Sequence, residues 1–176
     1  MREILFKAKR KDNGEWVEGY YIYHIKRTPS PIGDSVKPED EQHVIMRDGF
    51  SDWNMPRNTV HFDIDPETLC QYTGLKDKNG NKIWENDILM CHNNKNELVK
   101  AEYGEFYVID AETLERVDKV IGWNYSVITT DALSKCEPFC LPMPLTEEYI
   151  RSCEMAICGN IFDNPELLGD KNEQMA

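Results

Sequence analysis

The residues best suited to chemistry are a histidine and two aspartates at alternating positions, His61, Asp63 and Asp65. Successive side chains of a strand point to opposite faces, so a strand here would place all three on one face. An imidazole with two carboxylates is a ligand set that suits a divalent metal ion. The competing interpretation is a solvated strand face with Phe62 and Ile64 turned into the core, because period-two alternation alone produces this pattern. We favour the second interpretation and keep the three polar residues as candidate metal ligands.

Four of the six cysteines form two close pairs in the sequence, Cys136 with Cys140 and Cys153 with Cys158. Four thiolates could hold a structural zinc ion, although neither spacing is the tight C-x-x-C type. An apolar stretch surrounds the second pair, which favours buried thiols that pack as small core residues. A catalytic cysteine would also require a histidine beside it in space.

Other catalytic and cofactor-binding motifs are absent from the sequence. It contains no glycine-rich phosphate loop, no serine nucleophile elbow and no H-E-x-x-H motif. Asp77, Asn79 and Asn81 imitate the start of a calcium loop, but a glycine falls at the fourth position instead of the sixth, and Ile88 replaces the final glutamate. We therefore predict no catalytic residue and no cofactor, and we favour a protein that is not an enzyme.

The elements that would position these residues are antiparallel hairpins. The stretch Gln71–Leu89 has the pattern of a strand, a tight Asp-Lys-Asn-Gly turn and a second strand. A second turn of this kind, at residues 11–14, joins two more strands. We predict a mainly β fold of curled antiparallel hairpins, forming a small barrel or an open sheet, with a few short helical turns. The helical turns are predicted after Asp65 and at Glu147–Cys153 and Pro165–Leu168.

The composition along the chain predicts a single domain over residues 1–169. Residues 27–58 contain four prolines, two glycines and many charges, which predicts a long loop insertion with one short strand at residues 43–46. The polar tail at residues 170–176 is predicted to be disordered.

The stretch YTGLKDKNGNKIWENDIL, at residues 72–89, resembles the hallmark segment of the YopX family, small proteins of phages and prophages. Three other segments agree with the family in the same order, at residues 2–8, 65–68 and 159–168. Residues 25–58 and 93–157 depart from the short family pattern. The resemblance implies a mostly β phage or prophage protein of unknown function, and it carries over no activity and no functional residue.

The formal net charge of −12 limits the possible partners. Nonspecific binding of DNA or RNA requires a basic surface, so we do not expect nucleic acid as a partner. The excess of acid is explained by solubility, or by an acidic face that imitates nucleic acid or binds a basic host protein. No apolar run is long enough for a membrane span and the start lacks the apolar core of a signal peptide, so we expect no membrane contact and a cytoplasmic location in a bacterial host.

These observations predict a non-enzymatic phage or prophage accessory protein that binds an unidentified host or phage protein through exposed β surface or loops. Aromatic side chains dominate the energetics of interfaces, so candidate interface residues are Tyr21, Tyr23, Trp53 and Trp84. A homo-oligomer is also possible, because an open sheet edge invites pairing. Two alternatives remain: a nucleic-acid-binding β-barrel, and a metal-dependent hydrolase that uses His61 and Asp63.

Overall fold

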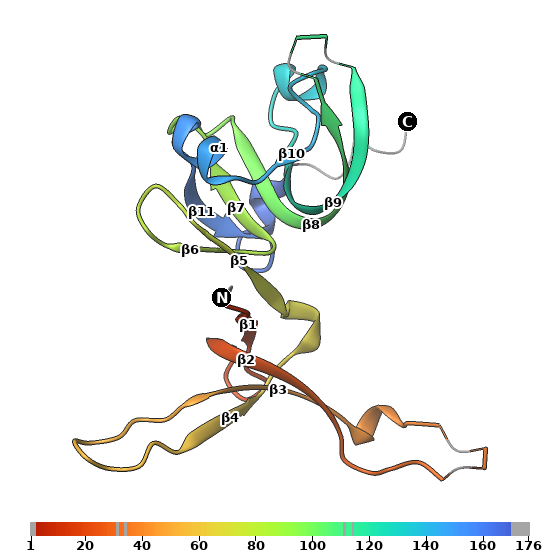
Figure 1. Ribbon diagram of the computed structural model, residues 1–176, viewed down its shortest axis with the longest axis vertical. Coiled ribbons are helices and arrows are strands. Elements are labelled where there is room, and N and C mark those ends of the chain that lie inside the picture. The colour runs from red at the N-terminus through yellow and green to blue at the C-terminus, as the bar shows by residue number, and fades with distance from the viewer. Residues whose placement is uncertain (1–2, 31, 34, 111, 114, 170–176) are drawn as a thin grey trace. The chain divides into compact units, whose positions relative to one another are not determined.

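The computed structural model describes residues 3–30, 32–33, 35–110, 112–113 and 115–169, and the predicted disordered tail at 170–176 lies outside them. The chain packs into two compact units, Met1–Tyr72 and Thr73–Ala176 (Figure 1). Both are built from antiparallel strands with a few short helical turns, which confirms the predicted fold class. Within the described ranges the sheets stay open, so the open-sheet form of the prediction holds and the barrel does not.

The first unit is a curled antiparallel meander. Its strands are β1 (Phe6–Lys9), β2 (Trp16–Ile25), β3 (Glu41–Asp48) and β4 (Thr59–Asp63). They lie side by side in the order β4-β3-β2-β1. Gly19 allows β2 and β3 to approach closely, because a Cβ there would overlap the carbonyl oxygen of Met46. The curl brings Arg10, just after β1, into an isolated bridge with Ile64, just after β4.

Four buried residues form the core of this unit: Ala8, Val17, Ile45 and Ile64. Partly buried hydrophobic residues pack around them, namely Phe6, Tyr21, Phe62 and Leu69. The predicted helical turn after Asp65 is present as η2 (Pro66–Thr68), where Asp65 accepts a hydrogen bond from the Glu67 amide.

The stretch predicted as a loop insertion, residues 27–58, is divided by a strand. The short strand expected at 43–46 is the eight-residue β3, which pairs with β2 on one side and β4 on the other. Two connections remain. Residues 26–40 end in the turn η1 (Pro38–Asp40), and residues 49–58 join β3 to β4. Because consecutive connections of a meander alternate between the ends of its strands, these two loops leave opposite ends of the sheet (Figure 1).

The second unit contains a five-stranded sheet in the order β10-β9-β8-β7-β11. Strand β5 (Cys70–Lys76) begins in the first unit and ends in the second, where it forms the central hairpin with β6 (Lys82–Trp84). The sheet strands are β7 (Asp87–Met90), β8 (Leu98–Ile109), β9 (Arg116–Val127), β10 (Met143–Pro144) and β11 (Ala156–Asn160). The helical elements are η3 (Leu133–Lys135), α1 (Glu147–Ser152) and η4 (Pro165–Leu168).

The core of the second unit lies where α1 packs on the sheet. Leu145 and Ile150, on either side of the N-cap residue Thr146, are buried with Leu89, Tyr125 and other apolar side chains. Thr146 accepts a hydrogen bond from the amide of Tyr149 at 3.2 Å, as the predicted helix start required. The turn of the central hairpin is held by Asp77, which is buried and accepts hydrogen bonds from the amides of its own turn.

Candidate functional site

The predicted metal ligands do not form one continuous face. His61 and Asp63 alternate on β4 and are exposed, as expected for a solvated strand face. The strand ends at Asp63, and Asp65 turns its carboxylate to the Glu67 amide at 3.1 Å. Asp63 accepts a hydrogen bond from the side chain of Gln42 at 2.6 Å. Among the described residues, no group of three or more His, Cys, Asp or Glu side chains could hold a metal ion.

The four cysteines considered for zinc lie in different parts of the second unit. Cys136 and Cys140 belong to the connection before β10, Cys153 ends α1 and Cys158 lies on β11. The Cys136 thiol donates a hydrogen bond to a carbonyl oxygen of its own segment, and the Cys158 thiol donates to that of Ile88. Burial raises the pKa of a fifth cysteine, Cys91, to about 12, and it also raises the pKa of Cys158. These two groups are therefore neutral thiols at physiological pH.

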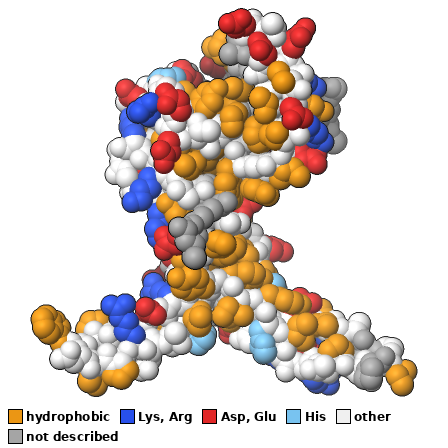
Figure 2. Space-filling model, in the orientation of Figure 1, with side chains coloured by type: hydrophobic (Ala, Val, Ile, Leu, Met, Phe, Trp, Pro, Cys, Tyr) orange, Lys and Arg blue, Asp and Glu red, His pale blue; other side chains and the backbone are white. Residues whose placement is uncertain are grey.

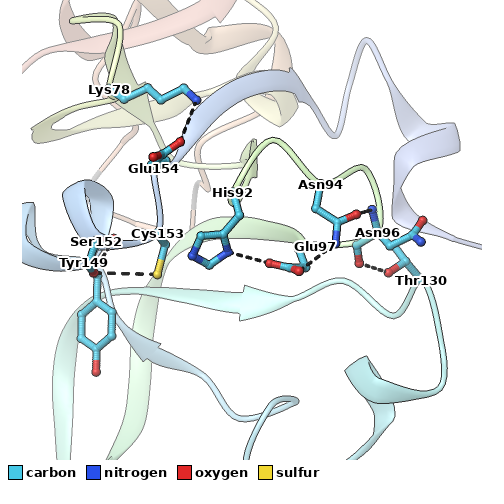
Figure 3. A network of polar contacts seen from close by, with 10 residues as sticks. All are labelled: Lys78, His92, Asn94, Asn96, Glu97, Thr130, Tyr149, Ser152, Cys153 and Glu154. Carbon is cyan, nitrogen blue, oxygen red and sulfur yellow. Dashed lines mark hydrogen bonds and ion pairs between the residues drawn. The ribbon is translucent and has the colours of Figure 1, made fainter.

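A polar network near Cys153 is the arrangement most similar to a catalytic site (Figure 3). His92 donates its backbone N–H to the Cys153 carbonyl at 2.8 Å. Its ring Nδ1 lies 2.7 Å from an oxygen of Glu97, whose other oxygen accepts a hydrogen bond from Asn94 at 2.7 Å. The hydrogen bonds from His92 and Asn94 hold the pKa of Glu97 below its usual value.

The contacts of this network stabilise the local fold. The Cys153 thiol lies 3.9 Å from the Ser152 hydroxyl, and no hydrogen bond joins it to the His92 ring within the described chain. His92 and Asn93 have φ values of 51° and 54°, which suit a tight hairpin turn closed by the bond from the Asn94 amide to the Cys91 carbonyl. The network therefore fixes the β7–β8 turn against the end of α1.

The four predicted interface aromatics have different environments. Trp53 and Tyr23 are exposed, whereas Tyr21 is half-buried, with its hydroxyl 2.7 Å from Nδ1 of His43. Trp84 is only 4% exposed, so the structure does not present its side chain as a surface contact. The hairpin that carries Trp84 turns the indole inward, and the Lys82 ammonium lies 5.6 Å from the ring centroid.

The largest exposed apolar side chains of the first unit gather on the β3–β4 connection, residues 49–58, which we call the aromatic loop. Phe50, Trp53 and Met55 are 94%, 93% and 64% exposed. The base of the loop is closed by a hydrogen bond from the Gly49 amide to the Asn58 carbonyl at 2.7 Å. In the space-filling view the tip of this loop is covered by apolar side chains (Figure 2).

A comparison with models of protein families shows the family to which the chain belongs. The family model described as YopX protein matches residues 5–169. The chain belongs to the YopX family. This confirms the resemblance found in the sequence, and the matched region includes both units and the aromatic loop. A search of curated proteins gave no match. None of the described helices is long and apolar enough to cross a membrane.

In this YopX-family chain, the sequence predicts Trp53 as a candidate interface residue but does not predict the equally exposed Phe50 or the exposed Met55. The available signal was three large apolar residues within a segment bounded by Gly49 and Pro56, in a stretch otherwise rich in charge. Such residues in a predicted loop have no strand or helix that would bury them, which marks them as exposed.

Proposed function

We propose that this YopX-family chain is a phage or prophage accessory protein that binds another protein through the aromatic loop and does not catalyse a reaction. The observation that carries the proposal is the near-complete exposure of Phe50 and Trp53 on one short loop. Monomeric proteins rarely leave several large apolar side chains together in water unless the patch binds something. Tryptophan is also the residue type most enriched among those that dominate binding energy.

Burial of the aromatic loop could supply a large part of the binding free energy of a specific complex. Fully burying a side chain such as Phe or Met contributes about 1.5–3 kcal/mol, so the three residues of the loop could supply roughly 6 kcal/mol. A micromolar complex requires about 8 kcal/mol net of the costs of association. The loop can therefore act as the main anchor, while neighbouring contacts of the same unit supply the remainder.

The charge near the loop favours a protein groove over a membrane surface. Arg57 pairs with Asp48 at 3.3 Å at the base of the loop, and Asp52 adds a negative charge within it. The whole chain carries a formal charge of −12 and would be repelled by anionic lipid. The same charge would favour a partner with a basic rim around an apolar groove, mainly by raising the association rate.

The test is an affinity capture from lysate of a bacterial host, with nuclease added, that compares the wild type with the double variant Phe50→Ser, Trp53→Ser. A matched control is Ile32→Ser, which alters an 88% exposed apolar residue on the loop at the other end of the sheet. We expect one stoichiometric protein that is captured by the wild type and by the control and is lost from the double variant. Equal capture by all three, loss of the partner on nuclease treatment, or Trp53-dependent binding to phospholipid vesicles instead would contradict the proposal.

A further inference from the structure

Strand β4 has an open edge at Thr59 and His61, whose backbone groups have no hydrogen-bond partner among the residues that the structure describes. Because the Gly49 amide bonds the Asn58 carbonyl and the Ile64 amide bonds the His43 carbonyl, the even-numbered residues of β4 turn their backbone toward β3. The N–H and C=O groups of Thr59 and His61 therefore point away from the sheet. Nothing in the described ranges hydrogen-bonds to them, and β4 is the outermost strand of its sheet.

The open edge has defined limits. At one end the Lys11 amide donates to the Asp63 carbonyl at 2.9 Å, and Arg10 bridges Ile64, so pairing is already complete there. At the other end the edge runs directly into the aromatic loop. Between these limits the strand has no proline and a regular register with β3, so neither a proline nor a β-bulge blocks pairing at this edge.

A cation lies over the same strand. The Arg47 guanidinium extends from β3 to 5.2 Å from the centroid of the Phe62 ring, and it forms no ion pair with any residue that the structure describes. Arg10 covers the same ring at 4.6 Å, but it is paired with Asp12 and Glu15. In a chain of net charge −12, Arg47 is thus available to a carboxylate placed beside Phe62.

We propose that the β4 edge binds an extended segment of the partner protein as an added strand, with an acidic side chain of that segment on Arg47. Backbone groups of the segment would pair with Thr59 and His61, while the aromatic loop holds the adjoining partner surface. This mode joins main-chain hydrogen bonds, which give affinity, to side-chain contacts, which give specificity. It deepens the proposed function, on which it rests, by naming the chemistry of the ligand.

The test uses a displayed library of random linear peptides, selected on the wild-type protein and then measured on variants. His61→Pro removes an N–H that points to the open edge, and the β3 pairing does not use this N–H, so the fold should be retained. His61→Ala changes the side chain and keeps that N–H. We expect enriched peptides with a conserved acidic position that bind the wild type and His61→Ala, and that lose at least tenfold in affinity on His61→Pro and on Arg47→Gln.

Peptides that bind His61→Pro as well as the wild type, or no enrichment at all, would overturn the proposal. A wild-type dimer that becomes monomeric in His61→Pro would show that a second copy occupies the edge, and would also overturn it. If His61→Pro does not fold, Thr59→Pro repeats the test at the other outward-facing position. Retention of the lysate partner by His61→Pro, with loss from the Phe50 and Trp53 variant, would refute the strand mode and leave the proposed function intact.

Discussion

At the residue scale, Asp77 shows how one side chain can define a hairpin and its surroundings. Its two carboxylate oxygens accept hydrogen bonds from the amides of Asn79, Asn81 and Ile157 at 2.8–3.1 Å. Burial alone would raise its pKa, but the hydrogen bonds from Asn81, Ile157 and Asn79 together lower it. Replacement by alanine leaves these donors without their acceptor in a buried site, so we expect Asp77→Ala to lower the free energy of unfolding by about 3 kcal/mol in urea titrations at neutral pH.

The pH dependence of a second variant, Asp77→Asn, provides the control. Because the folded-state pKa of Asp77 lies below its ordinary value of 3.8, the ionised carboxylate contributes its full stability above that value and loses it as the pH falls through the folded pKa. The stability gap between the wild type and Asp77→Asn should therefore narrow on acidification below 3.8. A gap that stays constant, or a cost of Asp77→Ala below about 0.5 kcal/mol, would show that the carboxylate is not the main constraint on this turn.

At the element scale, the backbone conformation at the end of α1 does not favour the residue that is found there. Glu154 has a φ of 48°, and bonds from its amide to Arg151 and from the Met155 amide to Ile150 form the helix ending that usually places glycine there. The ion pair of Glu154 with Lys78, at 3.8 Å and partly exposed, offsets little of this cost. We expect Glu154→Gly to raise the free energy of unfolding by about 0.5–1 kcal/mol, whereas Glu154→Ala does not. Equal stability of the two variants in urea titrations would contradict this.

Also at this scale, the sequence predicted elements wherever the cause was local. The Asp77 turn and the helical turns after Asp65 and at Glu147 depend on residues within a few positions, and all three are confirmed. The features that the sequence did not predict depend on distant neighbours. The sequence gives the same expectation for Trp53 and Trp84, yet the side chain of Trp53 is exposed and that of Trp84 is buried. Burial depends on which strands pack together in the fold. The bond from Ile157 to Asp77, separated by 80 positions, could not be inferred from spacing either.

At the scale of the whole molecule, charge is the property most accessible to measurement. The chain carries a formal charge of −12, and its described ion pairs lie mainly at the surface, where each contributes little. Self-repulsion should therefore destabilise the folded chain at low salt, and a Debye length of about 10 Å at 0.1 M salt is short enough to suppress it. We expect sodium chloride, raised from about 0.01 to 0.15 M at neutral pH, to increase the apparent Tm by a few degrees.

The same titration near the isoelectric point, about 4.8, separates repulsion from other effects of salt, because the net charge is then close to zero. The rise in Tm should disappear there. A rise of equal size at both pH values would assign it to general effects of salt on apolar burial instead. If repulsion is confirmed, the acidic surface lowers the stability of the folded chain, and the proposed gain in association rate with a basic partner is the function that would offset this cost.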